Sequence, residues 1–132
     1  MSDALTDLFE TSTLQYLFTT GTPSPARPTS WYVGLFASGN APTDSASGTE
    51  ISGNNYARVS ATFNVSGNQA SNTATLTFPT ASGSWGSVTT AGIFDASTSG
   101  NLIAYASLSN AKTIQNTDIL QIASGTLTVT LT

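Results

Sequence analysis

In the segment SWYVGLF, residues 30–36, successive side chains fall on two alternating sides, and both sides are mainly apolar. One side carries Trp31, Val33 and Leu35, and the other carries Tyr32, Gly34 and Phe36. Side chains of a β-strand alternate between two faces, and a strand that is apolar on both faces is covered on both. The segment therefore predicts a central strand of a layered β protein.

Further short runs with two-residue periodicity follow, separated by turn residues such as Pro79 and Gly125. The expected strands are residues 56–65, 73–78, 88–94, 102–108, 112–115, 119–123 and 126–131. Parallel strands would need crossovers of a dozen or more residues, which these short connections exclude. The sequence predicts an all-β fold, an antiparallel β-sandwich or jelly roll of about eight strands with a short N-terminal helix.

The N-terminal segment is the exception to the β pattern, because its apolar residues recur at helical spacing over residues 2–18. The expected apolar face consists of Leu5, Leu8, Phe9, Leu17 and Phe18. Ser2 is a candidate cap, Asp3 and Asp7 suit a helix N-terminus, and the polar run at residues 11–13 could divide the helix in two.

A connector rich in proline follows the helix. Gly21 precedes Pro23, Pro25 and Pro28, which end a helix and favour extended chain. We expect two parts: residues 1–22, with the helix and the start of the connector, and residues 23–132, the sandwich domain.

Side chains that perform chemistry are scarce. The 132 residues include no histidine, no cysteine and one lysine, and 8% are charged, against about a quarter in an average domain. Seven acidic and three basic residues give a net charge of -4, so no basic stripe is available for nucleic acid. The sequence contains no run of about 18 apolar residues, the length needed to span a membrane. We expect no cofactor, metal, nucleic-acid or membrane partner and no enzymatic activity.

Two catalytic interpretations are less well supported by the sequence than a structural role. Lys112 could form a Ser-Lys pair, but its flanks predict a solvated lysine on a strand. Glu50, Asp95 and Asp118 lie in separate loops, so only folding could pair two of them for glycoside hydrolysis. The loop at residues 95–101 superficially resembles a calcium loop but has Ala106 where an acid is needed; a β-turn is the favoured interpretation.

A sugar site is a further alternative, because aromatic side chains stack on sugar rings. Trp85, in the glycine-rich setting GSWGS, is the expected exposed platform, since Trp31 lies in an apolar strand. Asp44, Asn54 and Asn55, in polar loops, are the candidate glycan contacts beside Trp85.

Several stretches resemble a family of small tailed-bacteriophage virion proteins, often labelled tail-fibre-like. They are SWYVGLFASG, GTEISGNNYARVSATF, SNTATLTFPTASGSWGSVTTAGIFDASTSGNLIAY and the closing TLTVTL. The most specific parts are residues 50–58, 78–86 and 92–102. The resemblance implies a structural role in a phage particle, in either the head or the tail, and it supplies no catalytic residues. We expect a protein on the exterior of the particle, made in the host cytoplasm.

The leading hypothesis is a capsid decoration protein, a cement or head-fibre element that binds the major capsid protein. We expect a homo-oligomer, with a trimer as one option on a symmetric lattice. The alternative is a tail-fibre or baseplate component that binds tail proteins and contacts host-surface glycans. The N-terminal helix either docks on a neighbouring protein or covers an open end of its own sandwich.

Overall fold

Strand β2 (Trp31–Ala37) lies inside the main sheet of this computed structural model, which describes residues 4–131. The sheet has five strands in the order β1-β8-β7-β2-β3, and every neighbouring pair is antiparallel. Its other members are β1 (Ala4–Leu5), β3 (Val59–Ala61), β7 (Gly86–Phe94) and β8 (Leu102–Ile114).

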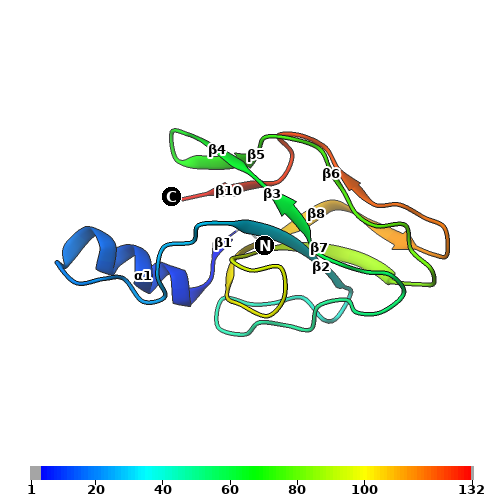
Figure 1. The fold of residues 1–132 in the computed structure, drawn as a ribbon, viewed down its shortest axis with the longest axis horizontal. Coiled ribbons are helices and arrows are strands. Elements are labelled where there is room, and N and C mark those ends of the chain that lie inside the picture. Colours follow the sequence, from blue (N-terminus) through cyan, green and yellow to red (C-terminus); the bar gives the residue numbers. More distant parts are fainter. Residues whose placement is uncertain (1–3, 132) are drawn as a thin grey trace.

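Two smaller sheets face the main sheet and form the second layer, as Figure 1 shows. One has the order β10-β5-β4, and the other pairs β6 with β9. Their strands are β4 (Phe63–Ser66), β5 (Gln69–Asn72), β6 (Leu76–Thr77), β9 (Gln121–Ile122) and β10 (Thr128–Thr130). The predicted antiparallel β-sandwich is thereby confirmed.

The two faces of β2 serve two different cores. Val33 and Leu35 are fully buried in the main core between the layers. Phe36 points to the other side, where it joins Phe94, Leu102 and Tyr105 in a smaller apolar cluster. The outer face of the main sheet is therefore also covered, which explains why β2 lacks a polar side.

The predicted and observed strands differ most at three places in the chain. Predicted residues 112–115 fall at the end of the single long strand β8, and predicted residues 56–65 divide into β3 and β4. Strand β5 was not predicted; it pairs with β4 across a two-residue turn in which Gly67 has a φ of 61°. This hairpin is largely exposed, with Val65 70% accessible, so apolar alternation is absent.

The helix is shorter than predicted. Helix α1 spans Asp7–Phe18, whereas Leu5 belongs to β1 and pairs with Ala104. The prediction that Leu5 lies in the helix is wrong, because Thr6 is tied to β8: its amide and hydroxyl donate to Ile103 O and Leu102 O. The proposed roles of Ser2 and Asp3 lie outside the described residues.

The polar run at residues 11–13 does not divide the helix. Thr13 Oγ1 donates to the Phe9 carbonyl at 2.7 Å, and Ser12 Oγ donates to Pro25 O at 2.7 Å. Both hydroxyl groups thus have partners within or beside the helix. At 12 residues α1 is too short to cross a membrane, and residues 4–131 contain no helix that is long and apolar enough to do so.

Candidate functional site

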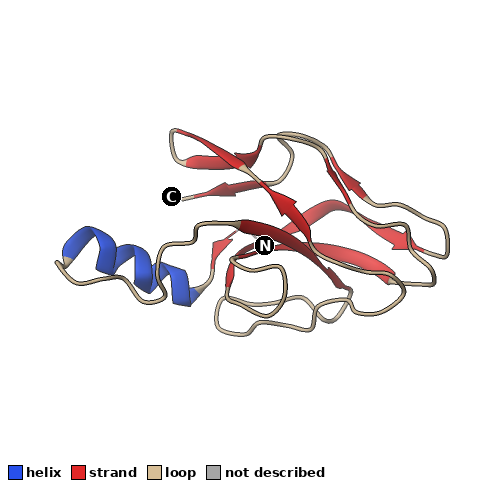
Figure 2. Ribbon diagram, viewed as in Figure 1, coloured by secondary structure: helices blue, strands red, loops and turns tan. Residues whose placement is uncertain are grey.

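The N-terminal hairpin, which we define as α1 and the connector that returns along it (residues 7–28), projects from one end of the sandwich (Figure 2). Phe9 is 5% exposed, but the distal half of α1 is open to solvent. The large apolar side chains exposed on the helix are Leu8, Leu14, Tyr16, Leu17 and Phe18. Phe18, at 78%, is the most exposed of them. The helix end is thus an apolar surface that its own sandwich does not cover.

The base of the hairpin is fixed to the body. The Asp7 amide donates to the Asp44 carbonyl at 2.9 Å, and Phe9 is buried beside it. Further out, Gln15 Oε1 accepts from the Ser24 amide at 2.9 Å and Ser12 holds Pro25. These bonds orient the helix and connector as one unit, so the exposed apolar end has a defined position.

Of the predicted docking residues, the structure keeps Leu8, Leu17 and Phe18 exposed on α1. Phe9 anchors the helix base, and Leu5 packs against the main core from β1. The sequence pattern missed Leu14 and Tyr16, which are 58% and 66% exposed. Both fit helical spacing, and only the interruption by polar residues 11–13 hid them.

The prediction that Trp85 is an exposed platform for a sugar is wrong. Trp85 is 5% exposed and packs edge to face against Tyr56, with ring centroids 5.4 Å apart. Its indole Nε1 donates to Asn54 O at 3.0 Å, and its amide donates to Ile114 O at 2.9 Å. The tryptophan is therefore a core residue whose polar edge is satisfied, and it offers no ring face to a sugar.

The other glycan candidates have structural partners. Asn54 and Asn55 have φ angles of 52° and 68°, and their side-chain amides donate to Ser84 O and Thr80 O. Both asparagines suit this left-handed turn, since Asn tolerates positive φ. The Asn54 carbonyl in this turn also accepts the hydrogen bond from the Trp85 indole.

Asp44 lies elsewhere, beside the helix base. Its carboxylate accepts a hydrogen bond from the Tyr105 hydroxyl on β8, near the opposite end of that strand from Ile114. Burial, together with the Asp44 carboxylate, raises the pKa of Tyr105 to about 12. The structure thus does not bring Asp44 together with the Asn54 turn.

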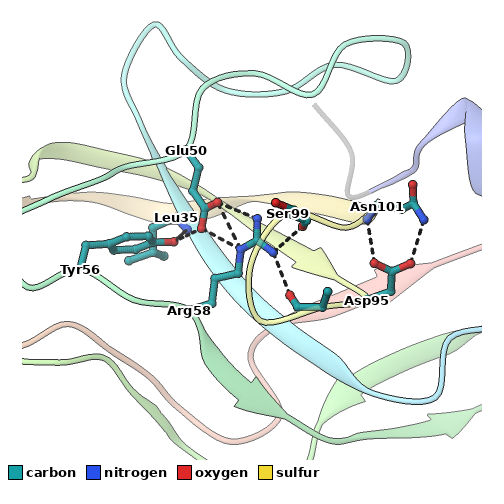
Figure 3. A network of polar contacts seen from close by, with 8 residues as sticks. Leu35, Glu50, Tyr56, Arg58, Asp95, Ser99 and Asn101 are labelled. Atoms are coloured by element: carbon teal, nitrogen blue, oxygen red, sulfur yellow. Dashed lines mark hydrogen bonds and ion pairs between the residues drawn. The ribbon is translucent and has the colours of Figure 1, made fainter.

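Glu50, Tyr56 and Arg58 form a polar network, shown in Figure 3. Arg58 donates hydrogen bonds to Glu50 from two nitrogens: Nη2 lies 2.8 Å from Oε1 and Nε lies 3.0 Å from Oε2. The Tyr56 hydroxyl donates to Glu50 and accepts from the Leu35 amide at 2.8 Å. Burial, reinforced by the Glu50 carboxylate, raises the pKa of Tyr56.

Arg58 also holds the loop after β7. Its Nη1 donates to Ala96 O and Ser99 O, each at 2.8 Å, and its guanidinium lies 3.5 Å from the centre of the Phe94 ring. Asp95 closes the same loop by accepting from the Asn101 amide and side chain. The network thus connects the segment at residues 50–58, which contributes Glu50, Tyr56 and Arg58, both to β2 and to the loop after β7.

The residues considered for catalysis have structural roles. Both Glu50 oxygens accept bonds from Arg58, and Asp118 accepts from the Gln115 amide at 2.9 Å. Lys112 is exposed on β8, as expected for a solvated lysine. Within residues 4–131, no three His, Cys, Asp or Glu side chains gather into a potential metal site.

The fold and the exposed hairpin define a β-sandwich protein with an apolar helical projection. A family model described as "Podophage GP4 fiber I protein gp80" matches residues 4–130. The chain belongs to this family, which confirms the resemblance to phage virion structural proteins. No curated protein matches the chain.

Proposed function

We propose that this protein is a non-enzymatic structural unit of a fibre on the outside of a phage particle, attached through the N-terminal hairpin. The observation that carries this proposal is the exposed apolar end of α1, where Leu14, Leu17 and Phe18 are each more than half accessible. Exposed contiguous apolar patches on soluble proteins commonly mark interaction sites. The sandwich would then form the part that faces solvent.

We propose a position in a tail fibre or baseplate first, with tail proteins as partners. The description of the matching family as a podophage fibre protein supports this choice over a cement coat. The glycan role drops out of the proposal, because Trp85 is buried and Asp44 lies apart from the Asn54 turn.

Capsid decoration is the second candidate. Every strand among residues 4–131 belongs to one sandwich, so the described chain supplies no shaft, and a short knob on a capsid suits such a body. Gold-labelled antibody against the sandwich, imaged on intact particles, distinguishes the two positions. Label on the tail supports the first candidate, and label distributed over the head supports the second.

Attachment itself is tested by adding purified protein to particles assembled without it. Replacing Leu17 and Phe18 together by Asp should weaken binding at least about 100-fold, because burying each side chain is worth about 1.5–3 kcal/mol. Val65→Asp is the matched control, since Val65 is 70% exposed but lies on the β4-β5 hairpin. Equal binding by both variants would refute attachment through α1.

A further inference from the structure

The exposed apolar groups of the N-terminal hairpin lie on two opposite sides of α1. Successive helix residues are rotated by about 100°, so Leu14, Leu17 and Phe18 form one stripe. Tyr16 is rotated by about 160° from Leu14 and faces the connector side. There it lines a hollow of about 360 Å³ together with Pro23, Arg27 and Pro28. A partner that contacts only the stripe would leave the tyrosine and this hollow in water.

The charge pattern of the hairpin is equally uneven. Asp7 and Glu10 lie at the helix base, and residues 11–26 carry no charge at all. Arg27 then stands at the rim of the hollow. The ion pair found within residues 4–131 is that of Arg58 with Glu50, so the exposed Arg27 guanidinium has no acidic partner in the described part of its own chain.

The exposed area argues against a contact on one side alone. If a large apolar side chain offers roughly 200 Å², the stripe of Leu14, Leu17 and Phe18 exposes on the order of 400 Å². A stable interface buries about 800 Å² on each partner. Two copies that paired through this stripe would therefore form a weak contact. Enclosing Tyr16, which is 66% exposed, together with the hollow and the exposed parts of the connector adds to the area that the stripe alone would bury.

We infer that the end of the hairpin, residues 11–27, is a plug that enters an apolar socket in a different virion protein, with a carboxylate at the socket rim facing Arg27. This inference rests on the proposed attachment through α1 and adds the nature of the partner surface. The socket encloses both the stripe and the Tyr16 side. The rim carboxylate gives the ion pair that Arg27 lacks within its own described chain.

The absence of cysteine from the sequence permits a direct test. Single cysteines replace Leu14, Tyr16, Leu17 or Phe18, and Val65→Cys serves as the exposed control. Each variant is treated with a small maleimide, first free in solution and then bound to particles assembled without the natural protein. All five should react in solution. On particles, the four hairpin positions should lose labelling while Cys at position 65 keeps it.

The pattern of protection separates the possible outcomes. Protection at positions 14, 17 and 18 with full labelling at position 16 would overturn the socket and leave the attachment intact. Labelling at all four positions on bound protein would overturn both proposals. Protection already in free protein, together with sedimentation as an oligomer, would show that a second copy covers the stripe and would also overturn the socket.

The rim carboxylate is tested separately through the effect of salt. The binding of Arg27→Gln to particles should depend less on salt concentration than that of the natural protein, because salt screens the ion pair between Arg27 and the rim carboxylate and the variant lacks that pair. Lys112→Gln is the matched control, since Lys112 is an exposed cation on β8. An unchanged salt dependence in Arg27→Gln would overturn the assignment of a carboxylate at the rim.

Discussion

Arg58→Met is the most informative perturbation of the fold, because Arg58 joins three separate parts of the chain. Methionine keeps much of the length and the apolar stem but removes the guanidinium. The substitution breaks the ion pair with Glu50 and the bonds to Ala96 O and Ser99 O. It also removes the cation above the Phe94 ring.

The expected loss of stability follows from burial. The Arg58 and Glu50 side chains are 8% and 22% exposed, so the pair is largely out of water. Removing one partner of a buried pair leaves an uncompensated charge, which costs about 3–5 kcal/mol. The partial exposure of Glu50 places this case near 3 kcal/mol, and that loss corresponds to a fall in Tm of about 10 °C for a domain of this size.

Urea unfolding and calorimetry measure the effect. The double variant Glu50→Gln with Arg58→Met should recover part of the lost stability, since the stranded carboxylate is gone. Lys112→Met, which removes an exposed cation, should stay within about 0.5 kcal/mol. A loss below about 1 kcal/mol in Arg58→Met, or no recovery in the double variant, would refute the reasoning.

Three further predictions concern the sheet, the tyrosine beside the helix base and the helix anchor. Gly34→Ala should destabilise by about 1–3 kcal/mol in urea unfolding, because the added Cβ would lie 2.5 Å from Glu50 Oε2 and 2.9 Å from the Tyr56 hydroxyl; Gly21→Ala, which meets nothing within 4 Å, is the control. Tyr105 has a raised pKa in the folded protein, about 12, so its contribution is present below the unfolded value near 10 and is lost as pH rises from 10 toward 12; Tyr105→Phe should lose less stability than the natural protein over that range. Phe9→Ala should cost about 3–5 kcal/mol or release α1 locally, which hydrogen exchange of the helix amides would reveal; protection unchanged from the natural protein, with no loss of stability, would contradict the anchor role.

Sequence patterns predicted elements where an apolar face meets a continuous core. Strand β2 was found from its two apolar faces, because burial imposes a period on the side chains. Helix α1 is the exception: helical spacing predicted it, although most of its apolar side chains are exposed and Phe9 is its buried apolar residue. The β4-β5 hairpin escaped this logic, since it extends into solvent and Val65 is exposed. Leu5 was assigned to the wrong element, because its pairing partner Ala104 lies far along the chain.

The site was only partly predictable for the same reason. The absence of charge over residues 11–26 of the N-terminal hairpin, and the apolar residues among them, can be read directly from the sequence. Whether Leu17 and Phe18 would be covered by their own sandwich depends on where the connector places α1, which no local pattern reports. Trp85 was misjudged because its glycine-rich flanks indicate an exposed turn, whereas Tyr56 and Asn54 close over it.

Composition and periodicity indicate an antiparallel sandwich poor in charge with an apolar helix at its start, and the resemblance of particular stretches to known sequences indicates the phage structural family. These properties are local or additive, so a linear chain displays them. The three-dimensional structure was needed to show that Arg58, Glu50 and Ala96 meet, that Trp85 is inside and that the end of α1 is outside. Each of these depends on contacts between residues distant in sequence, whose geometry exists only after the layers have packed.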